Sequence, residues 1–508
     1  MTLTTLISSH PDDAPALGAP DRAWLTYGAL RALASDVRAS LHTAGIGRGD
    51  RVAIVLPNGP EMAAAFVTIA QVATTAPLNP AYRREEYAFY LDDLGAKALV
   101  VAEDDHGPAV AAAEDRGVAV LRLVAVTDAP AGTFTLTGSA GGQAETTVPA
   151  ADDVALVLHT SGTTSRPKIV PLTQANLVAS ARNIATSLAL TPRDRCMNVM
   201  PLFHIHGLIA AVSASLGAGA SVFCAPGFDA LKFFGHLTAS EATWITAVPT
   251  MYQAVLPRAG RNREAIEGAN LRFLRSSSAS LPPQVMRDLG EAFGVPVIEA
   301  YGMTEATHQM TSNPLPPAAR KPGAVGLPAG PDVRVAATDA DRLLADGDTG
   351  EVVISGPNVT PGYESNPEAN AASFFQVDGQ RWFRTGDQGA VDADGYLFLT
   401  GRLKEIINRG GEKVSPLEVD AVLSDHPAVQ QAVTFALPHP KLGEEVAAAI
   451  VLREGAEADE AGIRAFATER LAAFKVPRKV VFLDEIPKGA TGKLQRIGLA
   501  DKLGLAGA

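Results

Sequence analysis

The segment Leu158–Lys168 reads LHTSGTTSRPK and directly follows a short apolar run, Val154–Leu158 (VALVL). The run predicts a buried strand, and the segment predicts a loop at the end of that strand. The small, hydroxylated and basic residues of this loop are Thr160, Ser161, Gly162, Thr163, Thr164, Ser165 and Lys168. Hydroxylated residues around a glycine let a loop turn N–H and O–H donors toward phosphate oxygens, and the lysine adds positive charge.

This loop alone allows two interpretations, a phosphate cradle or a solvated Ser/Thr turn, because short motifs often occur by chance. It is not a Walker loop, which needs Gly-Lys-Ser/Thr at its end. Here Pro167 precedes Lys168. This difference argues against a motor-type nucleotide hydrolase.

Short β-branched runs alternate with helical patterns on both sides of the loop. This alternation predicts an α/β fold with mostly parallel sheets covered by helices. We expect a loop between subdomains over Thr127–Thr147, which is rich in Gly, Ala and Thr, and a helix over Glu61–Val72. The expected strands are Arg51–Leu56, Lys97–Val101, Val154–Leu158, Asn198–Met200, Val295–Ala300 and Glu351–Ile354.

After Gly401 the alternation restarts on a smaller scale. We therefore expect a large N-terminal domain of several subdomains over residues 1–401 and a small α+β domain over residues 402–508. In the small domain the expected helices are Pro416–Ser424 and Glu460–Ala473, and the expected strands are Val433–Ala436, Val446–Val451 and Lys479–Leu483.

The net charge and the cysteine content exclude further classes of function. The 508 residues carry a formal net charge of −12, which argues against binding to nucleic acid or to an anionic membrane surface. The chain has only two cysteines, Cys196 and Cys224, and their spacing fits no paired motif. This argues against a disulfide scaffold and favours a reducing compartment. No secretory signal and no apolar run of spanning length stands out, so we expect a cytoplasmic protein.

Four further motifs follow the loop along the chain. YGMTE (Tyr301–Glu305) offers an aromatic ring for a base, a threonine for a phosphate and a glutamate for Mg²⁺. FRTGD (Phe383–Asp387) places one carboxylate on a tight turn, suited to two ribose hydroxyls. GRLKEIINRGG (Gly401–Gly411) and PKGATGK (Pro487–Lys493) complete the set. Each alone predicts a turn, but all five in this order are very hard to obtain by chance and indicate a nucleotide site.

This set resembles the adenylate-forming superfamily of acyl-CoA synthetases, luciferases and peptide-synthetase adenylation domains, over nearly the whole chain. The resemblance implies that Thr160–Lys168 holds the β- and γ-phosphates of ATP, with Tyr301 at the adenine, Thr304 at the α-phosphate and Glu305 on Mg²⁺. It also implies that Asp387 holds the ribose diol beside Arg402. The remaining ATP residues implied by it are Ala279, Ser280, Glu299 and Ala300.

The resemblance also assigns roles in the small domain, which it implies is mobile. Lys404 occupies the hinge position, Lys493 that of the catalytic lysine, and Gly410 and Gly411 lie beside the tunnel for CoA. The chain departs from the family pattern at Ser165 and Ile169, where glycines are usual, so we expect altered loop flexibility without loss of activity.

The implied chemistry activates a poor electrophile. A carboxylate resists attack by a thiol until it is joined to the α-phosphate of ATP, with release of pyrophosphate. Both reactants are anions, so Mg²⁺, Lys168 and Lys493 must offset their repulsion. Because the whole chain is acidic, the positive potential must be local to the cleft between the domains.

The segments expected to line the acid pocket are polar. FHIHG, RSSSAS and the run after Tyr301 contain His204, His206, His308 and Ser278, where a fatty or aryl acid would favour apolar residues. Each histidine alone is more often structural, and the family often has His at position 204 whatever the acid, gating the acyl and adenylate sites. Together they favour a short acid with a second carboxylate.

The runs SSASL, EAYGMTEATHQMTSNPLPP and RKPGAVG resemble the oxalate–CoA ligases in particular. By that resemblance His204, His206, Ser278 and His308 contact oxalate, and His204 joins Thr304, Glu305 and Lys493 among the catalytic residues. The alternatives are malonate or another short-, medium-chain or aryl acid, a module that loads a carrier protein, and a non-catalytic nucleotide-binding protein. The sequence leaves the oligomeric state open.

Overall fold

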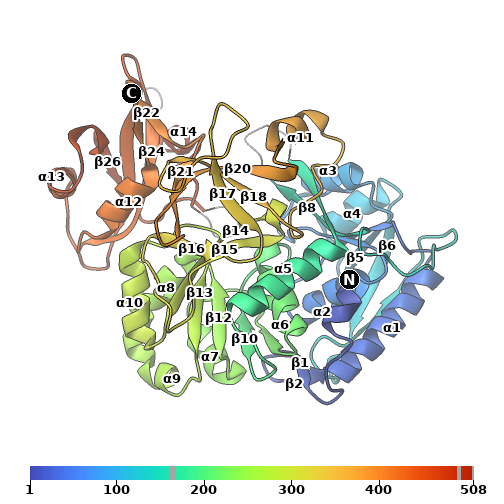
Figure 1. Cartoon of the computed structure of the whole chain (residues 1–508). Helices are drawn as coiled ribbons and strands as arrows, with labels where there is room; N and C mark the ends of the chain where they lie inside the picture. The colour runs from blue at the N-terminus through green and yellow to red at the C-terminus, as the bar shows by residue number, and fades with distance from the viewer. Residues whose placement is uncertain (161–166, 489–493, 506–508) are drawn as a thin grey trace.

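A computed structural model describes residues 1–160, 167–488 and 494–505 of the chain. The strands form three sheets, and elements from the two ends of the chain gather at opposite ends of the molecule (Figure 1). Helices α1 to α4 lie at one end, and the elements after β21 lie at the other, beside α8 and α10. This arrangement confirms a mixed α/β fold with a large sheet-rich N-terminal part and a smaller C-terminal part.

The first sheet has the strand order β7-β6-β5-β3-β4-β8-β9. Its inner strands are parallel, whereas β7 and β9 pair antiparallel at the two edges. The strands are β3 (Arg51–Val55), β4 (Thr74–Pro77), β5 (Ala98–Ala102), β6 (Ala119–Ala125), β7 (Phe134–Thr137), β8 (Val154–Thr160) and β9 (Lys168–Thr173). The prediction of a loop over Thr127–Thr147 is partly wrong, because Phe134 is buried and its strand pairs with β6.

The second sheet is larger and runs in the order β17-β18-β20-β21-β16-β15-β14-β13-β12-β10-β11-β1-β2, with β19 beside β20. Strands β1 and β10 to β14 are parallel, and the strands from β15 onward are antiparallel, so the expected parallel character holds for only part of it. The strands are β1 (Pro15–Ala19), β2 (Arg22–Thr26), β10 (Arg195–Asn198), β11 (Ser221–Cys224), β12 (Trp244–Ala247), β13 (Phe273–Ser276), β14 (Val297–Met303), β15 (His308–Ser312), β16 (Ala324–Pro328), β17 (Asp332–Ala336), β18 (Gly350–Ser355), β19 (Phe374–Val377), β20 (Gln380–Val391) and β21 (Leu397–Arg402).

The predicted strand Asn198–Met200 is wrong in its bounds, since β10 ends at Asn198. The Asn198 side chain accepts from the Met200 N–H at 3.1 Å and donates to the Met200 carbonyl at 3.2 Å. An asparagine that bonds the backbone two residues on favours a turn over a continuing strand. The chain therefore leaves the sheet here and turns toward His204.

The third sheet belongs to the C-terminal part and has the order β23-β22-β25-β24, with β26 beside β25. Its strands are β22 (Ile407–Arg409), β23 (Glu412–Val414), β24 (Val429–His439), β25 (Gly443–Leu452) and β26 (Lys479–Phe482). Helix α12 (Pro416–Ser424) matches the predicted helix, with Ser415 accepting from the Glu418 N–H as its N-cap. The division of the chain at residue 401 stays a prediction.

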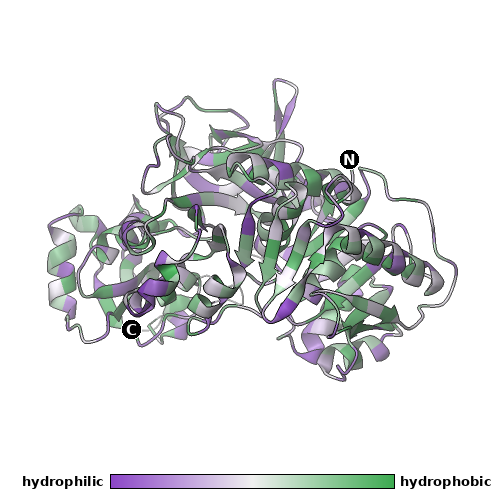
Figure 2. Cartoon of the chain, turned by 90° about the horizontal axis from the view of Figure 1, so that it is seen from below, coloured by the Kyte–Doolittle hydropathy of each residue, from purple (hydrophilic) through white to green (hydrophobic). Residues whose placement is uncertain are grey.

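Helices cover the faces of these sheets, and apolar residues concentrate in the strands between them (Figure 2). The predicted helix Glu61–Val72 is confirmed in its position as α2, which begins at Pro60 because proline suits the first helical turn, but its predicted end is wrong because the helix stops at Ile69. The helices not yet given are α1 (Tyr27–Thr43), α2 (Pro60–Ile69), α3 (Arg84–Leu94), α4 (Pro108–Glu114), α5 (Gln174–Ser187), α6 (Ala214–Gly217), α7 (Phe233–Ser240), α8 (Pro249–Ala259), α9 (Arg263–Glu267), α10 (Pro283–Phe293), α11 (Pro367–Ser373), α13 (Glu460–Thr468) and α14 (Leu499–Lys502), with the short helical turns η1 (Leu3–Leu6), η2 (His206–Ser213), η3 (Gly260–Asn262), η4 (Thr304–Ala306) and η5 (Ala473–Lys475). Among the described residues, none of these helices is both long and apolar enough to cross a membrane.

Candidate active site

The two ends of the hydroxylated loop lie side by side. Thr160 ends β8, Lys168 begins β9, and the two residues are register partners in an antiparallel pair. The loop thus leaves and re-enters the sheet at one place. The predicted phosphate contacts from Ser161, Gly162, Thr163, Thr164 and Ser165 lie outside the described residues.

A tyrosine that the sequence analysis did not single out joins the lysine to the YGMTE motif. The Lys168 Nζ lies 4.2 Å from the centroid of the Tyr363 ring. The Tyr363 hydroxyl donates to Glu305 Oε1 at 2.9 Å. A glycine followed by tyrosine carries little chemical signal by itself, so only the fold shows that this residue reaches both charged groups.

Thr304 and Glu305 lie on a single short helical turn directly after β14. This turn, η4, closes with the Thr307 N–H donating to the Thr304 carbonyl at 2.9 Å. Thr304 is partly exposed, whereas Glu305 is buried. Burial raises the pKa of Glu305, and the Tyr363 hydroxyl and the positive charges of Arg402 and Lys168 act in the opposite direction.

The expected ribose residues are in mutual contact. The Tyr301 hydroxyl donates to Asp387 Oδ2, and Arg402 Nε lies 3.2 Å from Asp387 Oδ1. Burial raises the pKa of Tyr301, and the neighbouring Asp387 carboxylate raises it further. Asp387 is buried and is the register partner of Arg402. The pairing of β20 with β21 therefore holds the carboxylate and the guanidinium together.

Glu299 supports the loop that carries two more expected ATP residues. Its Oε1 accepts from the Leu281 N–H at 2.9 Å, and its buried Oε2 has no partner among the described residues. Burial raises the pKa of Glu299 to about 8. Ala279 and Ser280 are exposed just before Leu281. Ala300, next to Glu299 on β14, is buried, and its carbonyl accepts from the Ser277 hydroxyl at 2.8 Å.

Three of the four residues expected at the acid converge. His206 Nδ1 lies 3.0 Å from the Ser278 Oγ, and the rings of His206 and His308 stack with centroids 4.8 Å apart. His206 begins the π-helix η2, a form often found at functional sites. His204 is half-buried, and its Nδ1 accepts from the His206 N–H at 3.2 Å. Ser278 has a φ of +72°, a conformation strained for any residue with a side chain.

At the centre of this cluster lies a fully buried arginine, Arg275, which the sequence analysis quoted within RSSSAS without giving it a role. Its guanidinium contacts two side-chain oxygens and two histidine ring nitrogens among the described residues, and none of these atoms belongs to a carboxylate. They are Thr246 Oγ1 and Gln309 Oε1, each at 3.1 Å, and the Nε2 atoms of His206 and His308, each at 3.4 Å. Its Nε has no partner in the same part of the chain.

Arg275 is a buried charge without a carboxylate partner in the described chain. No carboxylate of the described chain acts on its pKa, and burial lowers that pKa to about 10, so Arg275 still carries its charge at neutral pH. A buried charge without a counter-ion is costly. Arg275 therefore places a buried positive charge beside His206 and His308.

A close backbone approach builds one wall of this site. The Cβ of any residue placed at Gly302 would lie 1.7 Å from the His308 carbonyl oxygen. Gly302 pairs with Gln309 across β14 and β15, and the same hairpin carries Tyr301 and His308. A glycine is required here because the two strands leave no room for a side chain, and this brings the nucleotide and acid residues onto one hairpin.

The C-terminal residues that the resemblance singled out lie on two turns. Lys404 is exposed between β21 and β22. Gly410 and Gly411, with φ of +62° and +100°, form the turn between β22 and β23, where the Gly411 N–H donates to Asn408 Oδ1 at 3.1 Å. Positive φ at two successive residues favours glycine. Lys493, the expected catalytic lysine, lies outside the described residues.

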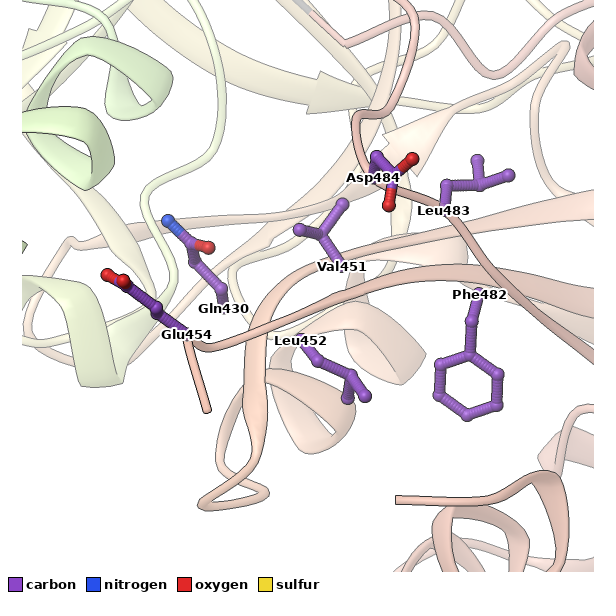
Figure 3. A pocket seen from close by; sticks show the side chains of 7 residues that line it. All are labelled: Gln430, Val451, Leu452, Glu454, Phe482, Leu483 and Asp484. Carbon is purple, nitrogen blue, oxygen red and sulfur yellow. The ribbon is translucent and has the colours of Figure 1, made fainter. Parts of the chain in front are cut away.

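A separate hollow of about 380 Å³ opens on the C-terminal sheet (Figure 3). Apolar side chains line much of it, including Phe482, which is 38% exposed. Glu454 and Asp484 stand at its edge. Two carboxylates would repel ATP, CoA and a small acid alike, so this hollow is not part of the anion site.

Comparison with known families agrees with the motifs. The family model described as AMP-binding enzyme matches residues 5–364. The model described as AMP-binding enzyme C-terminal domain matches residues 418–493. Together they cover the first sheet, the second sheet as far as β18, and the third sheet from β24 onward.

Similar proteins match over nearly their full lengths. An oxalate–CoA ligase of Arabidopsis thaliana is 47% identical over 501 residues, covering 95% of this chain and 94% of that protein. An oxalate–CoA ligase of Saccharomyces cerevisiae is 41% identical over 478 residues, covering 89% and 87%. The crystal structure of ATP-bound MatB from Rhodopseudomonas palustris superposes with a TM-score of 0.87 at 31% identity, covering 99% of both chains.

Proposed function

The chain belongs to the AMP-binding enzyme family, and on this premise we propose that it is an ATP-dependent acid–CoA ligase whose acid is oxalate. The relatives named as oxalate–CoA ligases support both the reaction class and the acid, since each is more than 40% identical over most of its length. The products are oxalyl-CoA, AMP and pyrophosphate.

One observation carries the choice of acid, namely that the buried Arg275 has no carboxylate of the described chain beside it. An acid with one carboxylate would place that group at the α-phosphate and leave Arg275 without a counter-ion. Oxalate has a second carboxylate directly beside the first, and this group would meet Arg275 together with His206 and His308. The pocket needs no long apolar slot, because oxalate has no chain to bury.

The reaction proceeds in two transfers. A carboxylate oxygen of oxalate first attacks the α-phosphorus of ATP, and the bond from that phosphorus to pyrophosphate breaks. The thiolate of CoA then attacks the acyl carbon of the adenylate, and the C–O bond to AMP breaks. In both steps the negative charge that develops needs donors held in place beforehand.

We assign the binding of ATP to the hydroxylated loop, Thr304, Asp387 and Lys493. Thr160, Lys168 and the loop between them would hold the β- and γ-phosphates, and Thr304 the α-phosphate. Asp387 would exchange its contact with Tyr301 for the ribose hydroxyls. Lys493 would supply charge at the reacting phosphate in the first transfer only, as its place in the motif PKGATGK implies by resemblance.

A magnesium ion fits Glu305. Mg²⁺ in nucleotide sites is usually held by one or two carboxylates, several waters and the substrate phosphates. Glu305 is a single buried carboxylate beside the phosphate lysine, and Tyr363 uses only Oε1. Among the described residues no cluster of three or more metal-ligating side chains competes for an ion. Bound there, the ion would neutralise phosphate charge.

For CoA we assign the turn at Gly410 and Gly411, with Lys404 as the hinge about which the C-terminal part moves between the two transfers. The exposed position of Lys404 between the second and third sheets is consistent with that role. A cytoplasmic location belongs to the same proposal, because both cysteines are free and buried, as expected in a reducing compartment.

The proposal is tested by measuring AMP release with Mg-ATP and CoA for oxalate, malonate, acetate, octanoate and 4-coumarate, with several amino acids added to the panel. A strong preference for oxalate is expected. A preference for octanoate or coumarate would refute the assignment of Arg275 and leave the adenylate chemistry in place. Pyrophosphate exchange with an amino acid alone would favour a carrier-loading module.

A further inference from the structure

We propose that Tyr363 is a positioning residue that holds Lys168 with its ring and Glu305 with its hydroxyl, and so keeps the two charges apart and available for Mg-ATP. This inference rests on the proposed function for the roles of Lys168 and Glu305. Neither family resemblance nor local sequence pattern assigns Tyr363 a role.

Tyr363 is well placed to serve as a fixed spacer. It is 6% exposed, and its backbone N–H donates to Asn370 Oδ1 at 2.7 Å while its carbonyl accepts from Asn370 Nδ2 at 2.8 Å. The Phe383 ring lies edge-on at 6.4 Å. With backbone and ring both held, the phenol has little freedom to follow either charge.

Both contacts suit the charges they meet. A lysine ammonium over the face of a tyrosine ring is attracted by the ring quadrupole. A hydroxyl that donates to a buried carboxylate supports its ionised form. The Lys168 Nζ lies at the face of the phenol, 4.2 Å from the ring centroid. The Glu305 carboxylate lies at the hydroxyl, 2.9 Å from its oxygen.

Without this spacer the two charges would be expected to pair. Opposite charges attract strongly in a partly desolvated site, and a direct pair would neutralise both groups before ATP arrived. In the described part of the chain no ion pair joins Lys168 to Glu305, although the lysine is close enough to act on the pKa of the carboxyl. The phenol is in contact with each of them.

The segment around Tyr363 is anchored without its phenol. Thr360 donates from its hydroxyl to the Pro171 carbonyl at 2.7 Å. The Glu364 N–H donates to the Ile169 carbonyl at 3.1 Å, and its carboxylate pairs with Arg51 at 2.5 Å. Removal of the hydroxyl alone should therefore leave the segment folded, and the variant tests only the separation of the two charges.

The chain provides a matched control in Tyr396. It is also 6% exposed, with Lys321 4.5 Å from its ring centroid and its hydroxyl donating to the Ala319 carbonyl at 2.5 Å. Tyr396 thus has a lysine at its ring and a hydrogen bond from its hydroxyl, here to a neutral carbonyl, and it touches no residue assigned to ATP. Substitutions there report the general cost of removing a tyrosine hydroxyl or ring.

The experiment compares Tyr363→Phe and Tyr363→Leu with Tyr396→Phe and Tyr396→Leu. Equilibrium binding of ATP is measured by calorimetry, once with Mg²⁺ and once with EDTA, and with no acid or CoA present. Tyr363→Phe keeps the ring for Lys168 and loses the hydroxyl, so it should weaken ATP binding about tenfold with Mg²⁺ and leave binding in EDTA nearly unchanged. Tyr363→Leu should weaken binding in both buffers.

Wild-type affinity for Tyr363→Phe in both buffers, or equal losses in the two buffers, would overturn the proposal. So would losses that the Tyr396 variants match. If Tyr363→Leu fails to fold, as judged by its melting temperature, the phenylalanine variant alone decides. Because no acid is present, a failure of the oxalate assignment would appear in the acid panel and leave this result intact.

Discussion

Replacement of Arg275 by methionine should separate oxalate from acids that have one carboxylate. Methionine keeps an unbranched chain of similar reach and removes the charge and the donors to Thr246 and Gln309. In the proposed complex the second carboxylate of oxalate is the full negative charge that Arg275 meets. An acid such as acetate has no group to place there.

The size of the effect follows from the burial of this contact. Two unit charges ~4 Å apart attract by ~4 kcal/mol at an effective dielectric constant of ~20. Loss of one partner of a buried, hydrogen-bonded charge pair costs ~2–5 kcal/mol in other systems. We therefore expect kcat/KM for oxalate to fall about 30-fold to 5,000-fold, since 1.4 kcal/mol is tenfold. The value for acetate should change by less than about threefold.

The stability of the free protein provides a second readout. Arg275 is fully buried, and no carboxylate of the described chain pairs with it, so its removal takes away an uncompensated charge. The melting temperature of Arg275→Met without ligands should stay the same or rise. As a control, Arg195→Met breaks a pair with Glu241 at 2.8 Å and should leave acid preference unchanged.

AMP release is measured for both acids with Mg-ATP and CoA saturating, and melting temperatures are measured by scanning fluorimetry. The reasoning would be refuted if Arg275→Met lost the same factor on oxalate and on acetate while its melting temperature was unchanged. That result would assign Arg275 to the general shape of the site.

Three further outcomes are expected. Asp387→Ala should raise KM for ATP more than it lowers kcat, because the carboxylate faces the ribose; an unchanged KM in steady-state assays would contradict this. Glu299 has a pKa of about 8 when folded and an ordinary value of 4.5, so ionisation is opposed in the native state and stability falls as pH rises between these values. The unfolding free energy of Glu299→Gln relative to wild type should therefore rise across that window, by at most ~1.4 kcal/mol per pH unit, and parallel curves in denaturant titrations would argue against it. Gly302→Ala should destabilise the chain by about 1–3 kcal/mol or more, since its Cβ would lie 1.7 Å from the His308 carbonyl oxygen. Gly235→Ala, in a helix with open space at its Cβ, is the control and should leave stability unchanged or raise it by up to about 1 kcal/mol.

Local pattern was sufficient for much of the fold. The helix α12 over Pro416–Ser424 follows directly from a serine cap and a proline at the first turn, and β3 follows from a β-branched run. The strand at Phe134 was missed because its surroundings have the composition of a loop, and only pairing with β6 makes it a strand. The predicted bounds of β10 were wrong because the Asn198 side chain hydrogen-bonds the backbone of Met200 and ends the strand there.

The sequence by itself determined the reaction class. Its five motifs, taken together and in their order, resemble those of adenylate-forming enzymes, and that resemblance implies the phosphate, ribose and metal contacts. It also indicated a polar acid pocket through His206, Ser278 and His308, because histidines stood where apolar residues serve other acids. These inferences required residue types and their order, and no knowledge of how distant segments meet.

Only the tertiary structure decided which charges stand opposite one another. Arg275 lies 69 residues from His206 and 33 from His308, and these three meet because β13, β15 and the π-helix η2 converge. Tyr363 lies 58 residues from Glu305 along the chain. It follows β18, whereas Lys168 begins β9, and the two side chains meet only in the folded protein. The physical reason is that the energy of a charge depends on its burial and on its neighbours in space, and neither is a property of the residue's place along the chain.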